Sequence, residues 1–291
     1  MSKVFIVAPH GNTHTDTISE GIKLANQLQK QPEVFAYCYE YFSGPEYYNP
    51  RLAAVAQQAL MKRREEEVRE QLKNIDASGV PLHLVWSKVL YEHVCHYSAQ
   101  HDFDMIIKWI DNKNHYLPID WHLIRHTPVP LMLLCDNPLN KANTILMAVD
   151  LDTTNPQKQS LNDLVIAQAK MLANATDAQL HLAHVIRVPP ILRDMDVLNI
   201  HEITASAHQK HAVKLKALGL APENIHLIAG DPELCLFELS CRLKSRYLVI
   251  GVRQRQGLLG HVLGNTAEAI LSRMRSNVLV VPTNSMTKTL Y

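Results

Sequence analysis

The chain has 291 residues, about twice the roughly 150 residues of a typical domain, so two medium-sized domains are expected. With 47% hydrophobic and 20% charged residues, its composition is typical of a globular protein. The 29 basic and 28 acidic residues leave a formal net charge of +1, so electrostatics alone gives no case for binding to nucleic acid or to a membrane surface.

The cysteines and the apolar segments indicate a cytoplasmic protein. The five cysteines are odd in number and form no CxxC pair, which favours reduced thiols over a disulfide framework. The apolar run at residues 4–9 is too short for a signal peptide. No apolar stretch approaches the roughly 18 residues that a membrane-spanning helix needs.

In the first half, short apolar runs alternate with helical patterns. Strands are predicted at residues 4–9, 34–39, 82–86, 105–110 and 130–134. Helices are predicted at residues 15–29, 49–77, 90–100 and 119–125, the longest ending just before Gly79.

The second half repeats the same order of elements. Strands are predicted at residues 144–149, 179–186, 224–229, 247–252 and 277–281. Helices are predicted at residues 160–174, 199–218, 234–243 and 261–273, and Gly219 stops the longest of them. A repeat of this length indicates two diverged copies of one domain.

Apolar strands that alternate with amphipathic helices predict an α/β fold with parallel sheets covered on both faces. We therefore expect two tandem, doubly wound, five-stranded domains of Rossmann-like type, at residues 1–138 and 142–291. The boundary falls in residues 136–143 (DNPLNKAN), where proline and asparagine interrupt the pattern. One large α/β domain of ten strands is the alternative.

The most informative segment follows the fourth strand of the second half. In an open parallel sheet, ligands bind beyond the carboxyl ends of the strands, and Asp150 and Val185 lie near two such ends. Glycines permit close approach of the backbone to a ligand, and four of the chain's ten glycines fall within residues 251–264. These four are Gly251, Gly257, Gly260 and Gly264.

Two further features of this segment suit an anion: positive charge and the start of a helix. Arg253 and Arg255 supply cations, and Asn265 or Thr266 can cap the helix that follows. The free amides at a helix N-terminus attract phosphate. From the residues alone two interpretations stay open, a phosphate-binding loop and a flexible strand-to-helix loop with a good cap.

The segment resembles the nucleotide-binding signature of the universal stress protein family. In that signature a glycine is followed after two residues by a second glycine, and after nine more by a glycine with serine or threonine. Gly251 and Gly264 match the spacing, whereas Gln254 stands at the second glycine and Asn265 at the hydroxyl residue. Gln254 places a side chain where the backbone of family members approaches phosphate.

Further positions fit the same resemblance. Asp150 matches the aspartate that contacts the nucleoside in ATP-binding members, and Val185 matches the position beside the adenine. Residues 230–232 (GDP) are similar to the family's turn after the third strand. The resemblance implies that ATP or AMP binds as a ligand, with no metal, at Asp150, Val185, Gly251, Arg253, Gly264, Asn265 and Thr266.

Two segments narrow the resemblance to the tandem E-type members of the family. They are residues 120–125 (DWHLIR) in the first half and residues 263–268 (LGNTAE) in the second. The first half departs from the nucleotide pattern, because Pro9 stands at the place of Asp150 and residues 108–115 contain no glycine. We expect no nucleotide site there, and Trp109 is a candidate to fill the corresponding pocket.

The sixteen histidines invite a metal or catalytic interpretation. No histidine has a cysteine or carboxylate residue at a sequence spacing familiar from zinc sites. We therefore expect the histidines to lie on the surface or to be hydrogen-bonded. The closely spaced pairs are His10 and His14, His93 and His96, His181 and His184, and His208 and His211. No G-x-S-x-G elbow, phosphate-binding P-loop or G-x-G-x-x-G fingerprint is present.

The resemblance implies a stress-response binding or adaptor module, with a role in resistance to stress such as DNA damage. A slow nucleotide hydrolase and a purely structural interaction protein without ligand remain alternatives. The apolar final strands of both halves are edge candidates that need cover, so we expect the halves to pair as a pseudo-dimer within the chain. Homodimerisation of whole chains and binding to stress-response proteins are further expectations.

Overall fold

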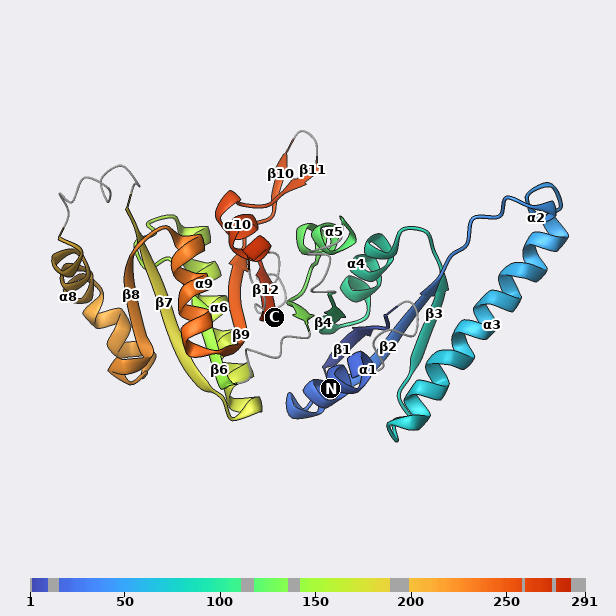
Figure 1. The fold of residues 1–291 in the computed structure, drawn as a ribbon, viewed down its shortest axis with the longest axis horizontal. Coiled ribbons are helices and arrows are strands. Elements are labelled where there is room, and N and C mark those ends of the chain that lie inside the picture. Colours follow the sequence, from blue (N-terminus) through green and yellow to red (C-terminus); the bar gives the residue numbers. More distant parts are fainter. Residues whose placement is uncertain are drawn as a thin grey trace. The chain divides into compact units, whose positions relative to one another are not determined.

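A computed structural model describes residues 2–9, 16–110, 118–135, 142–188, 199–257, 260–273 and 276–283. The chain divides into two compact units (Figure 1). The first unit comprises Met1–Trp109 and Pro118–Leu134, and the second comprises Ile110–Leu117 and Cys135–Tyr291. Most of the expected boundary segment, residues 136–141, lies outside the described residues.

The first unit contains five parallel strands in the order β3-β2-β1-β4-β5. The strands are β1 (Lys3–Val7), β2 (Gln31–Cys38), β3 (Leu82–Trp86), β4 (Phe103–Trp109) and β5 (Leu131–Leu134). The helices are α1 (Asp16–Gln27), α2 (Pro45–Tyr48), α3 (Pro50–Asn74), α4 (Leu90–Gln100) and α5 (Pro118–His126).

Aromatic rings fill the core of the first unit. Phe5, Phe35 and Phe103 come from three adjacent strands and are fully buried. The ring centroids of Phe5 and Phe35 are 5.1 Å apart, and those of Phe5 and Phe103 are 4.7 Å apart. These separations fall in the range at which aromatic pairs attract, so the three rings stabilise the packing of the central strands.

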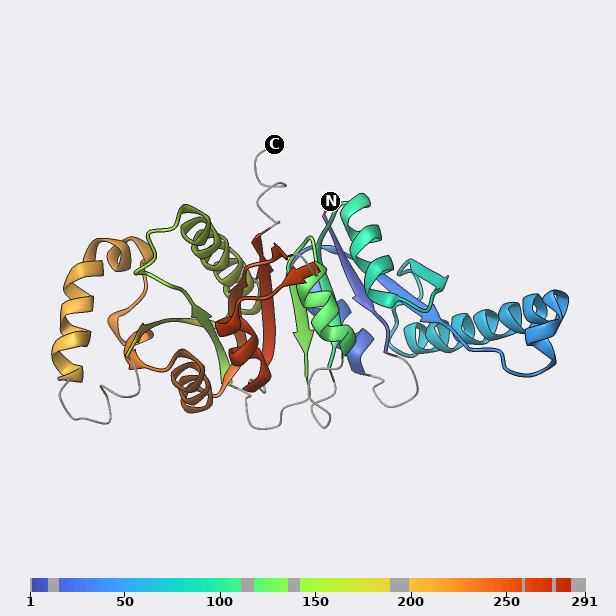
Figure 2. The same ribbon diagram turned by 90° about the horizontal axis from the view of Figure 1, so that it is seen from above.

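The second unit also contains five parallel strands, in the order β12-β9-β6-β7-β8. They are β6 (Ala142–Ala148), β7 (Gln179–Arg187), β8 (Ile225–Gly230), β9 (Ser245–Val252) and β12 (Asn277–Pro282). The helices are α6 (Pro156–Thr176), α8 (Ile200–Leu218), α9 (Pro232–Leu243) and α10 (Asn265–Arg273), with a short 3-10 turn η1 (Pro222–Asn224). The helices α6 and α9 lie on opposite faces of these strands (Figure 2).

The α/β class with parallel, doubly wound sheets is therefore confirmed. Capping residues explain several helix ends. The Asn49 side chain accepts hydrogen bonds from two amides of the first turn of α3, and Gly219 ends α8 in the left-handed region at φ 70°. None of the described helices combines the length and the apolar character needed to cross a bilayer.

Three local expectations are wrong. The long helix of the first unit ends at Asn74, and the left-handed residue after it is Asp76, so Gly79 does not stop it. The short helix α2 precedes it, although the sequence pattern predicts none there. Residues 261 and 262, predicted as the start of a helix, instead belong to β11 (Gly260–Val262), which pairs with β10 (Arg255–Gly257) as an antiparallel hairpin.

Gly251 lies where strand β9 packs tightly against helix α6. A Cβ atom at this position would lie 2.8 Å from Cγ of Leu161 and 3.1 Å from Cγ2 of Val165. Real Cβ atoms essentially never lie within 3.0 Å of a non-neighbouring heavy atom, so any larger residue here would force the Leu161 side chain to shift, and packing favours glycine.

Replacing Gly251 with alanine should destabilise the second unit by about 1–3 kcal/mol, because the added methyl overpacks the contact with Leu161. Urea unfolding followed by circular dichroism measures this. Gly79→Ala is the matched control, since a Cβ there meets nothing within 4 Å. A Gly251→Ala protein as stable as the parent would contradict the packing role.

A pair of histidines between β7 and β8 gives the fold a pH dependence. Nδ1 of His181 lies 3.1 Å from Nε2 of His226. Burial, with smaller contributions from the charges of His181 and Arg242, lowers the pKa of His226 to about 4. The unfolded chain therefore binds this proton at a higher pH than the folded chain does.

The free energy of unfolding should be at its full value above pH 6.5 and fall as the pH drops from 6.5 towards 4. His226→Leu should flatten that fall, whereas His208→Leu, at an exposed position on α8, should not. Urea unfolding at several pH values in this range measures the slope. An equal slope in His226→Leu and the parent protein would refute the assignment.

Candidate functional site

The carboxyl ends of β6, β7 and β9 meet at one edge of the second unit, as the parallel order requires. Asp150 follows β6 there and is about half exposed. Its carboxylate lies 3.5 Å from Nζ of Lys158, and its backbone exchanges two hydrogen bonds with the side chain of Asn162. The aspartate is thus held beside the start of α6 with its carboxylate still open to solvent.

Side chains alternate along β7 and divide this edge into two faces. His184 and Ile186 point to the face that carries α8, because His184 lies close to the α8 side chains and Ile186 lines a cleft with them. Val185 and Arg187 point to the other face. Nη2 of Arg187 donates to Oγ1 of Thr266, 2.9 Å away, which brings the N-terminus of α10 to this second face.

The N-terminus of α10 holds three of the predicted residues. The Gly264 carbonyl accepts from the Glu268 amide at 3.1 Å, which closes the first turn. A Cβ at Gly264 would meet nothing within 4 Å, so space lies open beside it. Thr266 is exposed, and Asn265 is the first helical residue, with its side chain outside the described atoms. The first amides of a helix have no acceptor within it, and the exposed Arg187 lies beside them.

The rest of the predicted loop is used differently. Gly257 and Gly260 form the last cross-strand pair of the β10–β11 hairpin, so they do not lie along a continuous phosphate loop. The Gln254 amide donates to Oγ1 of Thr283 at 3.4 Å. Arg253 is half-buried, and Gly251 packs closely against Leu161 of α6. The structure therefore gathers Val185, Gly264 and Thr266 on one face, with Asp150 at the neighbouring strand end.

The first unit fills its corresponding edge with its own charged side chains. Arg64 of α3 is buried and donates to the carbonyl of Pro9, the residue at the place of Asp150. Nζ of Lys108 lies 2.6 Å from the carboxylate of Asp120, and the Asp120 side chain is only 1% exposed. The sequence analysis named Trp109, at the start of a glycine-free loop, as a candidate to fill the corresponding pocket. Residues 111–117 of that loop lie outside the described residues.

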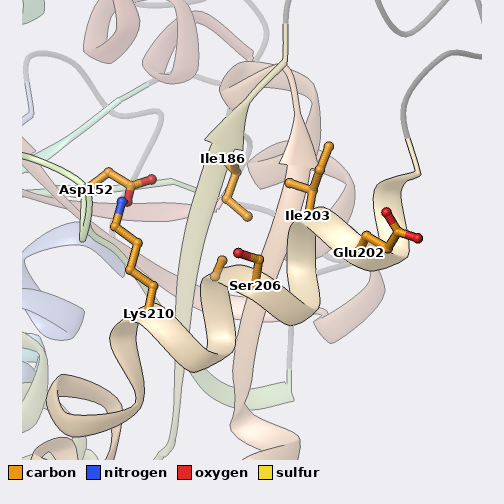
Figure 3. Close-up of a pocket in the computed structure, with 7 residues that line it drawn as sticks. Asp152, Ile186, Glu202, Ile203, Ser206 and Lys210 are labelled. Atoms are coloured by element: carbon orange, nitrogen blue, oxygen red, sulfur yellow. The ribbon is translucent and has the colours of Figure 1, made fainter.

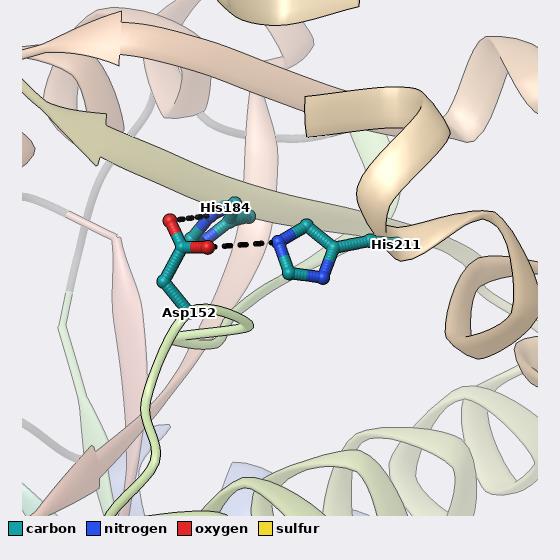
Figure 4. Close-up of side chains that lie close together, drawn as sticks. All are labelled: Asp152, His184 and His211. Carbon is teal, nitrogen blue, oxygen red and sulfur yellow. Dashed lines mark hydrogen bonds and ion pairs between the residues drawn. The ribbon is translucent and has the colours of Figure 1, made fainter. Parts of the chain in front are cut away.

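A second cluster of side chains was missed by the sequence analysis. Oδ2 of Asp152 lies 3.2 Å from Nε2 of His184, and its Oδ1 lies 3.0 Å from Nε2 of His211 (Figure 4). Both imidazoles are almost fully buried. The histidines are 32 and 59 residues from the aspartate, so no local spacing could show the cluster. The neighbouring His208, by contrast, is exposed, as expected for a surface histidine.

Lys210 adds a cation to this cluster. Its Nζ lies 2.5 Å from Oδ1 of Asp152. The hydrogen bond from Lys210 is the largest cause that lowers the pKa of Asp152 to about 2; the hydrogen bond from His211 and the charge of His184 contribute to the same shift, and burial opposes it. The carboxylate is therefore ionised throughout the physiological range.

A cleft of about 380 Å³ opens beside the cluster (Figure 3). Asp152 and Lys210 close one end of it, and Ile186 forms part of its floor. The remaining lining residues, Glu202, Ile203, Ser206 and Ala207, come from α8. The cleft thus belongs to the α8 face of β7, opposite Val185 and Arg187.

Comparison with known proteins relates the chain to one family. The family profile described as the universal stress protein family matches residues 142–282. The curated protein named Universal stress protein E from Escherichia coli K12 is 26% identical over 250 residues, covering 80% of this chain and 78% of the relative. A Universal stress protein E homolog from Haemophilus influenzae is 24% identical over 212 residues, covering 68% of each.

Solved structures show the same fold over the whole chain. A structure described as a putative universal stress protein from Pseudomonas aeruginosa superposes with a TM-score of 0.71 at 21% identity, covering 100% of this chain and 97% of that one. A universal stress protein from Archaeoglobus fulgidus gives a TM-score of 0.61 at 14% identity, covering 97% and 99%.

Lys210→Met should raise the pKa of Asp152 from about 2 towards its ordinary value of 3.8, because the largest cause of the lowering is removed. An NMR titration of the carboxyl carbon measures it. Lys216→Met, which removes an exposed lysine of the same helix, is the matched control. A pKa that stays near 2 in Lys210→Met would show that another group holds the charge.

Proposed function

The chain belongs to the universal stress protein family, and we propose that it acts as a stress-response binding module whose second unit holds an adenine nucleotide. The site would lie at the carboxyl edge of the second sheet, on the face of β7 that carries Val185 and Arg187. The single observation that carries the proposal is the 2.9 Å hydrogen bond from Arg187 to Thr266, which joins a strand-end cation to the N-terminus of α10.

The physical basis is a local excess of positive charge. A helix N-terminus carries roughly half an elementary charge and presents free amides, and a guanidinium beside it matches a phosphate. Arg187 would swing from Thr266 to the phosphate, or hold both. Open space beside Gly264 leaves room for a phosphate oxygen near these amides.

The other parts of the nucleotide would lie along the same edge. The carboxylate of Asp150, half exposed and directed to solvent, is suited to accept from ribose hydroxyls. Val185 offers a partly exposed apolar surface for the adenine, and Arg253 adds a second cation after β9. The sheet edge would thus contact base, sugar and phosphate from different strand ends.

We propose a matching division of labour between the two units. The first unit fills its edge with Arg64 at Pro9 and with the Lys108–Asp120 pair, so it would serve as a structural partner of the second. Pairing of the two units within the chain, dimerisation of whole chains and binding to stress-response proteins complete this proposal. A cytoplasmic location and a role in resistance to DNA damage belong to it as well; the location is supported by an odd number of cysteines without a CxxC pair, a pattern that favours reduced thiols.

One observation favours a second candidate, a structural interaction protein without ligand. The Gln254 amide is bonded to Thr283, at the position where the family's backbone approaches phosphate. With that bond in place, the Gln254 backbone would not contact a phosphate, and α10 with Arg187 and Arg253 would have to bind it. Nucleotide titration separates the two candidates.

Isothermal titration of the full chain with ATP, AMP and adenosine tests the proposal. ATP should bind more tightly than adenosine, and Arg187→Met should weaken ATP binding by about tenfold, which corresponds to one charge-assisted contact of about 1.4 kcal/mol. The same substitution should leave adenosine binding nearly unchanged, because adenosine has no phosphate.

Arg242→Met is the matched control, since this exposed arginine lies in the last turn of α9. It should bind ATP as the parent protein does. If neither ATP nor AMP gives a heat of binding, or displaces a fluorescent adenine analogue, the nucleotide site is refuted and the structural candidate is favoured.

A further inference from the structure

Three donor groups converge on one point of the second unit from separate elements. Asp152 lies in the turn after β6, His184 on β7 and His211 on α8. One ligand atom from each lies within 4.8 Å of the other two. Figure 4 shows both imidazole rings directed at the carboxylate. Among the described residues, these three are the group that brings together enough such donors for a metal ion.

We propose that Asp152, His184 and His211 form a binding site for a divalent first-row transition metal, with zinc as the preferred ion. Two imidazole nitrogens and one carboxylate oxygen are a ligand set that such ions accept, and a hard ion such as magnesium would prefer oxygen donors alone. At metal–ligand distances of about 2.0–2.2 Å, tetrahedral donors are about 3.3 Å apart. The two imidazoles approach different carboxylate oxygens, His211 at 3.0 Å from Oδ1 and His184 at 3.2 Å from Oδ2, and one atom from each of the three residues lies within 4.8 Å of the others. A small rotation of the side chains would bring one oxygen and both nitrogens to the tetrahedral spacing.

The surroundings already hold the ligands in place. Nδ1 of His184 accepts from the Leu151 amide at 3.3 Å and lies 3.3 Å from the Val149 carbonyl. With a metal on Nε2, Nδ1 would carry the proton and donate to the Val149 carbonyl, the arrangement typical of metal-bound histidine, and the Leu151 amide would give up this acceptor. The side chains of His184 and His211 are only 1% and 4% exposed, so bulk water competes little for their nitrogens.

The site would be open on one side. Three protein ligands leave a fourth position of a tetrahedral ion free, as in catalytic rather than structural zinc sites. Asp152, the partly exposed ligand, lines the cleft of about 380 Å³, so the free position would face that cleft and take water or an anionic group (Figure 3).

Lys210 competes with the metal for the same carboxylate. Its Nζ lies 2.5 Å from Oδ1 of Asp152, and it must withdraw when a dication binds there. Removing this lysine should therefore strengthen metal binding. A purely structural hydrogen-bond network predicts no such gain, so the lysine distinguishes the two.

The site is separate from the nucleotide edge. His184 and Ile186 occupy one face of β7, whereas Val185 and Arg187 occupy the other. Two other histidine pairs, His83 with His93 and His181 with His226, have nitrogens 3.0 and 3.1 Å apart. Neither pair has a third such donor among the described residues, so neither is proposed.

Titration of the full chain with zinc chloride after chelator treatment, without nucleotide, tests the proposal. One zinc should bind per chain and raise the melting temperature in a concentration-dependent way. Asp152→Asn and His211→Gln should each weaken binding by at least about 100-fold, because loss of a ligand exceeds the 10–100-fold cost of losing a ligand's supporting partner. Lys210→Met should tighten binding several-fold.

Two controls keep the result interpretable. His208→Gln removes an exposed histidine three residues before His211 on the same helix and should change nothing. Glutamine at position 211 keeps an amide donor for Asp152, so that variant should fold, which circular dichroism checks. Cobalt in place of zinc should give the visible absorption of a tetrahedral nitrogen–oxygen site.

Several outcomes would overturn the proposal. These are no zinc binding, binding unaffected by the Asp152 and His211 substitutions, or a thiolate-to-cobalt charge-transfer band, which would assign the metal to cysteines. Loss of ATP binding in other variants has no bearing on these outcomes, because nucleotide is absent from the titration.

Discussion

The alternation of side chains along β7 divides the edge of the second unit into two separate chemical environments. Because successive residues of a strand face opposite sides, His184 and Ile186 meet α8 while Val185 and Arg187 meet the side of α10. One strand end thus contributes to a buried imidazole–carboxylate cluster and to an exposed cationic helix terminus. Shifting β7 by one residue would exchange the two sets and abolish both arrangements.

The two units are built on the same plan but use the carboxyl edge of their sheets in different ways. In the first, Arg64 reaches the carbonyl of Pro9 and Lys108 pairs with the buried Asp120, so protein charges occupy the edge. In the second, the corresponding Asp150 keeps its carboxylate half exposed, and a cleft lies alongside β7. Because burial of a charge is costly unless it is paired, Lys108 and Asp120 satisfy each other and do not offer free charges to a ligand at this edge.

The strands and most helices of both units could be predicted from the sequence, because buried parallel strands read as continuous apolar runs and helix ends carry their own signals. The order of the strands within each sheet was not predicted, since it depends on how the strands pair in space. Asn49 and Gly219 are examples in which one residue marks a boundary. The β10–β11 hairpin was missed, because glycines that suit a phosphate loop suit a tight turn equally well. Gly251 matched the family spacing, but its tight contact with Leu161 depends on tertiary packing that no motif contains. The Asp152–His184–His211 cluster was missed for a similar reason, since its members come from three elements far apart in the chain.

The central claim is that the second unit binds an adenine nucleotide on the Val185–Arg187 face of its sheet edge. A crystal structure of the full chain grown with ATP tests this most directly. Phosphate density within hydrogen-bonding distance of the α10 N-terminus and Arg187, with the ribose near Asp150, is the predicted result. A structure grown at saturating ATP with no nucleotide at this edge, or with nucleotide in the first unit or in the α8 cleft instead, would contradict it.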